Sequence, residues 1–155
     1  MLSTIRAAFH TRLGLLAGCA TLSPAMASSE AQPYDDLEAQ EEVEAIMSPE
    51  GGAVVIDFWS PSCGPCMAMA NDFAQVAAQF DREEVRFCKV NTATHGWLAA
   101  PFNVMSVPTI LFVLDGDVKD AVVGRMDAKR LGSRAEWLHN KKLRRAKGLL
   151  GRLFG

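Results

Sequence analysis

The chain has 155 residues, of which 49% are apolar, and a formal net charge of −2. This fits one globular domain with extensions and excludes a small disulfide-stapled scaffold, since there are only 4 cysteines. The near-neutral total charge gives no indication of a nucleic-acid partner, and none is expected. Charge is nevertheless uneven, because residues 28–50 carry acids without a base and residues 141–155 carry bases without an acid.

Residues 1–27 have the three-part layout of a secretory signal peptide. A basic, acid-free start, MLSTIRAAFHTR, precedes the short apolar run LGLLAGCATL, and small residues follow at Ala25 and Ala27. We expect cleavage after Ala27 and a periplasmic or otherwise exported protein. Two alternatives stay open. LAGC resembles a lipobox that would anchor the protein through a lipid on Cys19, and the Arg-containing start also fits a mitochondrial transit peptide.

The rest of the chain alternates between helical and strand-like patterns. An acidic segment, 28–52, contains a predicted amphipathic helix over 35–47, and the apolar run AVVIDFW over 53–59 predicts a strand buried on both faces. The later predicted elements are a helix from 63 to about 80, a strand over 84–90, a hairpin over 109–126 and a helix capped by Asp127.

This order of elements implies an α/β fold with a mixed central sheet flanked by helices. A first strand stays in doubt, because residues 28–34, SSEAQPY, lack β character.

The stretch DFWSPSCGPC places two cysteines where the strand over 53–59 ends and a helix begins. Unpaired backbone N–H groups and the positive end of the helix dipole favour a thiolate at Cys63. Gly64 and Pro65 fit the first turn, and Cys66 lies one turn further in, close enough to bond Cys63. Cys63 is therefore the candidate nucleophile and Cys66 the resolving thiol.

Two other interpretations of the cysteine pair compete with this one. An inert structural disulfide is disfavoured, because a pair separated by two residues closes too small a loop to add much stability. A zinc site would need Cys88 and His95 as further ligands, and the sequence has no second CxxC motif. We expect a redox-active pair, no metal ion, and Cys88 as a buried core thiol.

Residues 53–140 resemble the thioredoxin family. DFWSPSCGPC, VPT at 107–109, DG at 115–116 and VG at 123–124 occur in the family's order and at nearly its spacings. The resemblance implies a thioredoxin-like fold and thiol–disulfide oxidoreductase activity. It implies no cofactor other than the redox-active Cys63/Cys66 disulfide itself.

The resemblance also implies roles for single residues. Asp57 is similar to the family's buried acid beneath the disulfide, with Lys89 as its partner. An acid inside an apolar strand is costly unless it is paired or accepts a proton, so we expect Asp57 to accept the proton of Cys66. The resemblance further implies a cis-proline at 108 and, at 124, a glycine that lets a substrate backbone approach. The expected substrate-binding residues are Trp59, Gly64, Pro65, Val107, Pro108 and Gly124.

The rim of the site departs from the family pattern. Ser62 stands where thioredoxins usually have tryptophan, and Thr92 and Ser106 occupy further rim positions. These polar residues predict a weaker docking surface and a narrower substrate range.

The resemblance implies protein disulfides as substrates and an electron donor, such as a membrane thiol–disulfide transporter or a thioredoxin reductase. The Gly-Pro dipeptide between the cysteines resembles that of reducing thioredoxins and favours a reductant. The alternative is a non-catalytic thioredoxin-like binding or assembly module attached to a membrane or a partner.

The C-terminal segment KKLRRAKGLLGRLFG, residues 141–155, extends past the thioredoxin-like region. If it is helical, its apolar residues gather on one side among bases, which is typical of a helix that lies on an anionic membrane surface. There are two alternatives: the segment is a solvated tail, or it folds back on the acidic helix over 35–47.

Overall fold

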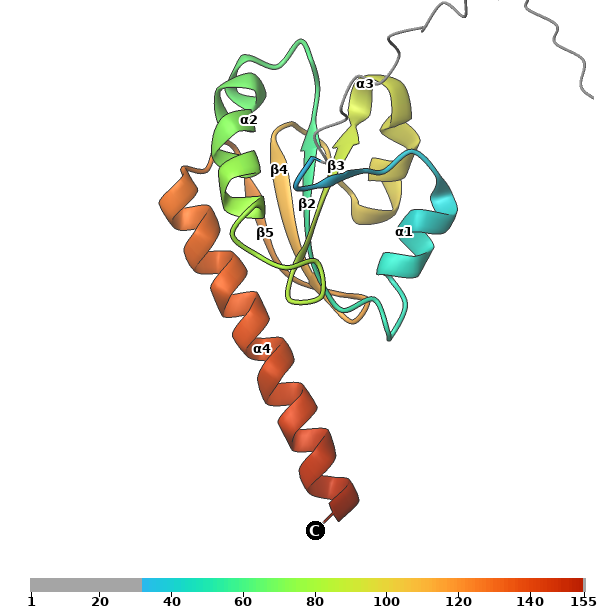
Figure 1. Ribbon diagram of the computed structural model, residues 1–155. Coiled ribbons are helices and arrows are strands. Elements are labelled where there is room, and N and C mark those ends of the chain that lie inside the picture. The colour runs from blue at the N-terminus through green and yellow to red at the C-terminus, as the bar shows by residue number, and fades with distance from the viewer. Residues whose placement is uncertain (1–31, 155) are drawn as a thin grey trace, which may run out of the picture. The chain divides into compact units, whose positions relative to one another are not determined.

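The computed structural model describes residues 32–154, and a five-stranded sheet forms the centre of this part of the chain (Figure 1). The predicted signal segment and Cys19 lie outside these described residues. In chain order the elements are β1 (Asp35–Asp36), α1 (Gln40–Ile46), β2 (Ala53–Trp59), α2 (Gly64–Ala77), β3 (Arg86–Asn91), α3 (Thr92–His95), the 3-10 helix η1 (Gly96–Phe102), β4 (Thr109–Leu114), β5 (Asp117–Val123) and α4 (Ala128–Phe154).

The sheet is mixed, with the strand order β1-β3-β2-β4-β5. Strand β3 runs parallel to both β1 and β2, whereas β4 runs antiparallel to β2 and to β5. Six of the seven β2 residues are buried, which explains the unbroken apolar run in the sequence. The α/β fold with a mixed sheet is therefore confirmed.

Helices cover both faces of the sheet, with α2 and α4 on one face and α1 and α3 on the other (Figure 1). Successive β2 side chains alternate between the two cores: Val55 packs with the α2 and α4 residues, and Ile56 packs with the α1 residues. By the same alternation, Asp57 and Lys89 of β3 lie on the α2 face. Cys66, in the first turn of α2, lies above that face.

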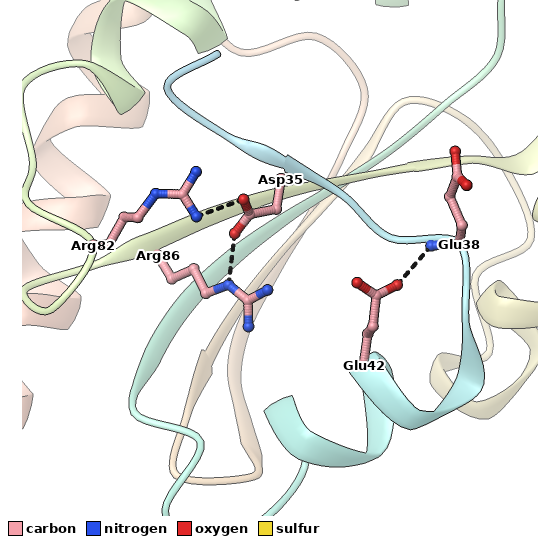
Figure 2. A network of polar contacts seen from close by, with 5 residues as sticks. All are labelled: Asp35, Glu38, Glu42, Arg82 and Arg86. Atoms are coloured by element: carbon pink, nitrogen blue, oxygen red, sulfur yellow. Dashed lines mark hydrogen bonds and ion pairs between the residues drawn. The ribbon is translucent and has the colours of Figure 1, made fainter. Parts of the chain in front are cut away.

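The predicted helix over 35–47 is wrong at its start. Asp35 and Asp36 form β1 and pair with β3, so the first strand that stayed in doubt is present. The helix begins only at Gln40, where the Glu42 carboxylate accepts hydrogen bonds from the backbone N–H groups of residues 38 and 39. The side chain of Asp35 holds β1 in place by accepting hydrogen bonds from two arginines, Arg82 and Arg86 (Figure 2).

The other predicted elements are confirmed within a few residues of their expected ends. Asp127 caps α4 as expected, because its Oδ1 accepts a hydrogen bond of 2.8 Å from the backbone N–H of Arg130. The basic C-terminal segment is not a separate element, since α4 continues through it as one helix to Phe154.

None of the helices between residues 32 and 154 combines the length and apolar character needed to cross a membrane.

Candidate active site

The two cysteines of the CxxC motif form a disulfide at the start of α2. Cys63 is the N-cap of the helix, and its Sγ accepts a hydrogen bond of 3.2 Å from the backbone N–H of Cys66. Cys63 is half-buried, whereas Cys66 is 2% exposed. The predicted arrangement, an accessible sulfur at the helix start and a deeper one a turn later, is present. An incoming thiolate or disulfide therefore has access to Cys63 first.

A buried ion pair lies on the face of the sheet that α2 covers. The Nζ of Lys89 is 3.5 Å from Oδ2 of Asp57, and the two residues are 4% and 0% exposed. Neither carboxylate oxygen of Asp57 has a hydrogen-bond partner among the described residues. Burial raises the pKa of Asp57 from 3.8 to about 6, even though the Lys89 charge opposes the shift. The carboxylate can therefore take up a proton close to neutral pH.

Aromatic rings enclose the ammonium group of Lys89. Its Nζ lies 4.7 Å from the ring centroid of Trp59, 5.2 Å from that of Tyr34 and 5.6 Å from that of Phe73. Ring faces attract a cation, so they stabilise the lysine charge where water cannot reach it. The sequence predicted Lys89 and Trp59 at the site but not Tyr34, which precedes the region where the family motifs occur.

The loop before β4 and the end of β5 lie together. The Val107–Pro108 peptide bond is cis, as the resemblance implied, and the carbonyl of Pro108 accepts a 2.8 Å hydrogen bond from the N–H of Gly124. Gly124 has a φ of 97°, a conformation that favours glycine, and a Cβ at this position would meet no atom of residues 32–154 within 4 Å. The glycine therefore leaves open space in which another backbone can approach.

The predicted polar rim is present only in part. Ser62 and Ser106 are exposed, but the hydroxyl of Thr92 donates a 3.0 Å hydrogen bond to the backbone carbonyl of Trp59 and so is tied to the end of β2. Ser62 Oγ lies 3.0 Å from Ser60 Oγ, within hydrogen-bonding distance.

Three exposed apolar side chains that the sequence analysis missed neighbour the site along the chain. Met67 follows Cys66 and is 54% exposed, Met105 lies two residues before Val107 and is 88% exposed, and Val123 precedes Gly124 and is 71% exposed. In the sequence, Met67 is out of phase with the buried residues of α2, which recur every three or four positions from Cys66. This helical spacing could have predicted from the sequence that the Met67 side chain is exposed.

Cys88 is fully buried as a free thiol in the core on the α1 face. Burial raises its pKa to about 12, so it stays protonated and unreactive at neutral pH. No cluster of three or more His, Cys, Asp or Glu side chains within residues 32–154 could hold a metal ion. Cys88 lies in the core on the α1 face, whereas Cys66 belongs to α2 on the other face of the sheet, so the structure does not bring these candidate zinc ligands together.

Comparison with known proteins gives one consistent family. The thioredoxin family model matches residues 35–136. Thioredoxin 1 of Synechococcus elongatus is 35% identical over 80 residues, which are 52% of this chain and 74% of the relative. The thioredoxin of Mycoplasma genitalium is 31% identical over 96 residues, 62% of this chain and 91% of the relative. The match starts at β1, so the thioredoxin-like region is longer at its N-terminal end than the predicted range of 53–140.

Solved structures give the same fold. The thioredoxin of Malassezia sympodialis superposes with a TM-score of 0.61 at 25% identity and covers 68% of this chain and 90% of its own. A mutant thioredoxin from Halobacterium salinarum also has a TM-score of 0.61, at 26% identity, and covers 70% of this chain and 93% of its own.

Proposed function

Because the chain belongs to the thioredoxin family and is a thiol–disulfide oxidoreductase, we propose that it acts outside the cytoplasm as a reductant of protein disulfides. The observation that carries the proposal is the position of the Cys63–Cys66 disulfide. One sulfur is accessible at the start of α2, the other is buried behind it, and a carboxyl group whose pKa is near neutral lies on the sheet face beneath.

The reaction uses the reduced dithiol. The Cys63 thiolate attacks one sulfur of the substrate disulfide, that bond breaks, and the second substrate sulfur leaves as a thiolate that takes up a proton. The Cys66 thiol then gives its proton to Asp57 and attacks the Cys63 sulfur, and the bond between Cys63 and the substrate breaks. The first substrate sulfur leaves as a thiolate and becomes the second thiol when it takes up a proton, which Asp57 returns to the solvent. The substrate gains two electrons, and the protein ends as the Cys63–Cys66 disulfide.

Substrate backbone is proposed to lie along Val107 and Pro108, with the open side of Gly124 next to it. This placement is supported by the open space at Gly124 and by its hydrogen bond to the Pro108 carbonyl, which fixes the two segments relative to each other. Gly64 and Pro65 are exposed in the first turn of α2 and provide contact area next to Cys63. The exposed apolar side chains nearby add to that area.

Each turnover leaves the protein oxidised, so a dithiol donor must reduce it again. A membrane thiol–disulfide transporter or a thioredoxin reductase would serve, and an exported protein needs the former kind. The layout of residues 1–27 supports export. Determining the mass of the mature N-terminus checks this point: a start at Ser28 supports cleavage, a lipid on Cys19 supports an anchored form, and an intact Met1 contradicts export.

Turnover of a disulfide substrate tests the proposed activity. We expect Cys63→Ser to abolish reduction, and Cys66→Ser to accumulate a mixed disulfide that is visible by mass, because the resolving thiol is lost. Cys88→Ser, which alters the buried free thiol, is the control and should keep the activity of the parent. A parent protein that binds disulfide substrates without reducing them would instead support the binding-module alternative.

A further inference from the structure

Helix α4 continues past the part of it that packs on the sheet (Figure 1). Its core-facing residues, Leu131, Ala135 and Leu138, are fully buried. Beyond residue 140, every described side chain except that of Lys142 is exposed. We call residues 141–154 the α4 extension. Its helical conformation does not depend on burial in the core of this domain.

Most apolar and basic side chains of the α4 extension lie on different sides of the helix, and Lys142 is the base that falls on the apolar side. At 100° per residue, Leu143, Ala146, Leu149 and Leu150 share one side of the helix. The three leucines among them are 43%, 62% and 55% exposed, which is unusual for side chains of this type gathered on one helix face. The opposite side and its flanks carry the bases Lys141, Arg144, Arg145, Lys147 and Arg152.

The rest of the described chain covers this face only in part, since Ala146 and Leu149 line a shallow hollow together with Pro49 and Asp115. Arg145 pairs with Asp115 at 3.0 Å, and Nζ of Lys142 donates to the carbonyl of Glu83. Among the described residues, no ion pair joins the α4 extension to the acidic helix α1. Helix α1 is therefore not the partner of the described bases of the extension.

The contact with Asp115 locates the α4 extension relative to the active site. Asp115 lies in the turn between β4 and β5, and its N–H donates to the carbonyl of Gly52, just before β2 begins. Cys63 follows the other end of β2. A strand of seven residues is about 23 Å long, so the α4 extension lies at the end of the sheet opposite the disulfide.

We propose that the α4 extension lies on an anionic lipid surface, with its leucines in the headgroup region and its bases against the lipid charges. Exposed leucines gain nothing from nucleic-acid phosphates, and a second copy of the same face would bring like charges together. An anionic bilayer satisfies both kinds of side chain at once.

Sedimentation with vesicles tests this proposal on the full chain. The parent should bind vesicles that contain phosphatidylglycerol more tightly than vesicles of phosphatidylcholine alone, and added salt should weaken the difference. The double variant Arg144→Glu and Lys147→Glu should lower the affinity for anionic vesicles by about tenfold or more. The variant Leu149→Ser and Leu150→Ser should also lower it, because the apolar contribution is lost.

Matched controls separate this surface from the rest of the chain. The double variant Lys129→Glu and Arg130→Glu changes the net charge by the same amount as the 144/147 variant, but at the end of α4 that packs on the sheet. It should bind anionic vesicles as tightly as the parent does. All these variants keep residues 1–27, so any contribution from that segment cancels in the comparison. Equal binding of the 144/147 variant and the parent would overturn the proposal, as would an oligomer that the leucine variant dissociates in the absence of lipid.

Discussion

The carboxyl group of Asp57 lies in a strand buried on both faces, and its nearest charge is the Lys89 ammonium at 3.5 Å. Lys89 is itself held by the rings of Trp59, Tyr34 and Phe73, so its position is set by packing as much as by the ion pair. The attraction does not repay the full cost of burying the carboxylate, since the pKa of Asp57 is still raised to about 6. A group that is costly to ionise in the folded protein is well suited to receive a proton.

Replacing Asp57 by asparagine should stabilise the protein in a pH-dependent way. Between the unfolded pKa of 3.8 and the folded pKa of about 6, the folded chain binds more protons, so the parent loses stability as the pH rises through this window. We expect Asp57→Asn to be more stable by up to about 3 kcal/mol above pH 7 and to lose this advantage near pH 4. Denaturant unfolding at both pH values checks this, with Glu136→Gln as a surface control.

The same variant tests the chemical role of Asp57. If the carboxylate accepts the Cys66 proton, Asp57→Asn should reduce disulfides more slowly near and below neutral pH. Equal rates for variant and parent from about pH 6 to 9 would leave Asp57 with a purely structural role.

The residues of the site differ in how far the sequence could predict them. Cys63, Cys66 and Pro108 could be placed because their types and spacings are distinctive and because each sits at a junction between elements. The aromatic enclosure of Lys89 could not, since Tyr34 comes from a segment without periodicity and reaches Lys89 only through the fold. The exposed Met105 was also missed, because a lone methionine in a loop carries no pattern that predicts its exposure.

At the scale of elements, β1 shows why short edge strands escape prediction. Two residues are too few for an alternating pattern, and two acids fit the first turn of a helix equally well. What places them at the sheet edge is the pairing of Asp35 with Arg82 and Arg86, which lie more than forty positions away (Figure 2). By contrast, β2 could be predicted because its seven consecutive residues, AVVIDFW, are almost all apolar, which is typical of a strand buried on both faces.

The ion pairs of Asp35 with Arg82 and Arg86 should contribute modestly to the stability of β1. Partial burial alone would raise the pKa of Asp35, but hydrogen bonds from Arg86 and Arg82 outweigh it and lower the pKa. The contribution is therefore present above the unfolded pKa and is lost as the pH falls through the folded pKa. We expect Asp35→Asn to cost about 1 kcal/mol at neutral pH, since the partners are partly exposed, and almost nothing in strong acid.

Urea unfolding at the two pH values measures this effect. Asp36→Asn is the matched control, because partial burial raises the pKa of this neighbouring acid and no such loss is expected. A loss as large for Asp36→Asn as for Asp35→Asn would contradict the assignment to the arginine pairs.

The loops next to the disulfide should determine how well large substrates bind. Met105 and Val123 are highly exposed, and each lies close in the chain to residues that we propose contact the substrate backbone. We expect Met105→Ser with Val123→Ser to lower kcat/KM for a protein disulfide by about tenfold, mainly through KM, because apolar contact area is lost. Reduction of a small-molecule disulfide should change little.

Val118→Ser is the control for this pair, because it removes an exposed valine from the other end of β5. In the opposite direction, Ser62→Trp should raise kcat/KM for protein disulfides by adding contact area beside Cys63. If the double variant slowed both classes of substrate equally, the loops would be acting on the chemistry rather than on docking.

At the scale of the whole molecule, α4 serves two purposes along its length. Its first half completes the core on the α2 face through Leu131, Ala135 and Leu138. Its second half touches the rest of the described chain through polar contacts, chiefly those of Lys142 and Arg145. The sequence predicted the basic amphipathic pattern of residues 141–155, but not that the helix would run without a break from one role into the other.

This division predicts that the fold and the redox activity survive without the α4 extension. A chain ending at Asn140 keeps every fully buried α4 residue and the whole candidate active site, and it loses only partly exposed polar contacts such as Arg145 to Asp115. We expect its free energy of unfolding to fall by no more than about 1 kcal/mol and its kcat/KM to stay within about twofold of the parent. Arg145→Ala in the full chain is the control, because it removes the ion pair and keeps the helix, and it should account for much of the stability change. A shortened chain that unfolds at neutral pH would show instead that the extension helps to hold α4 on the sheet.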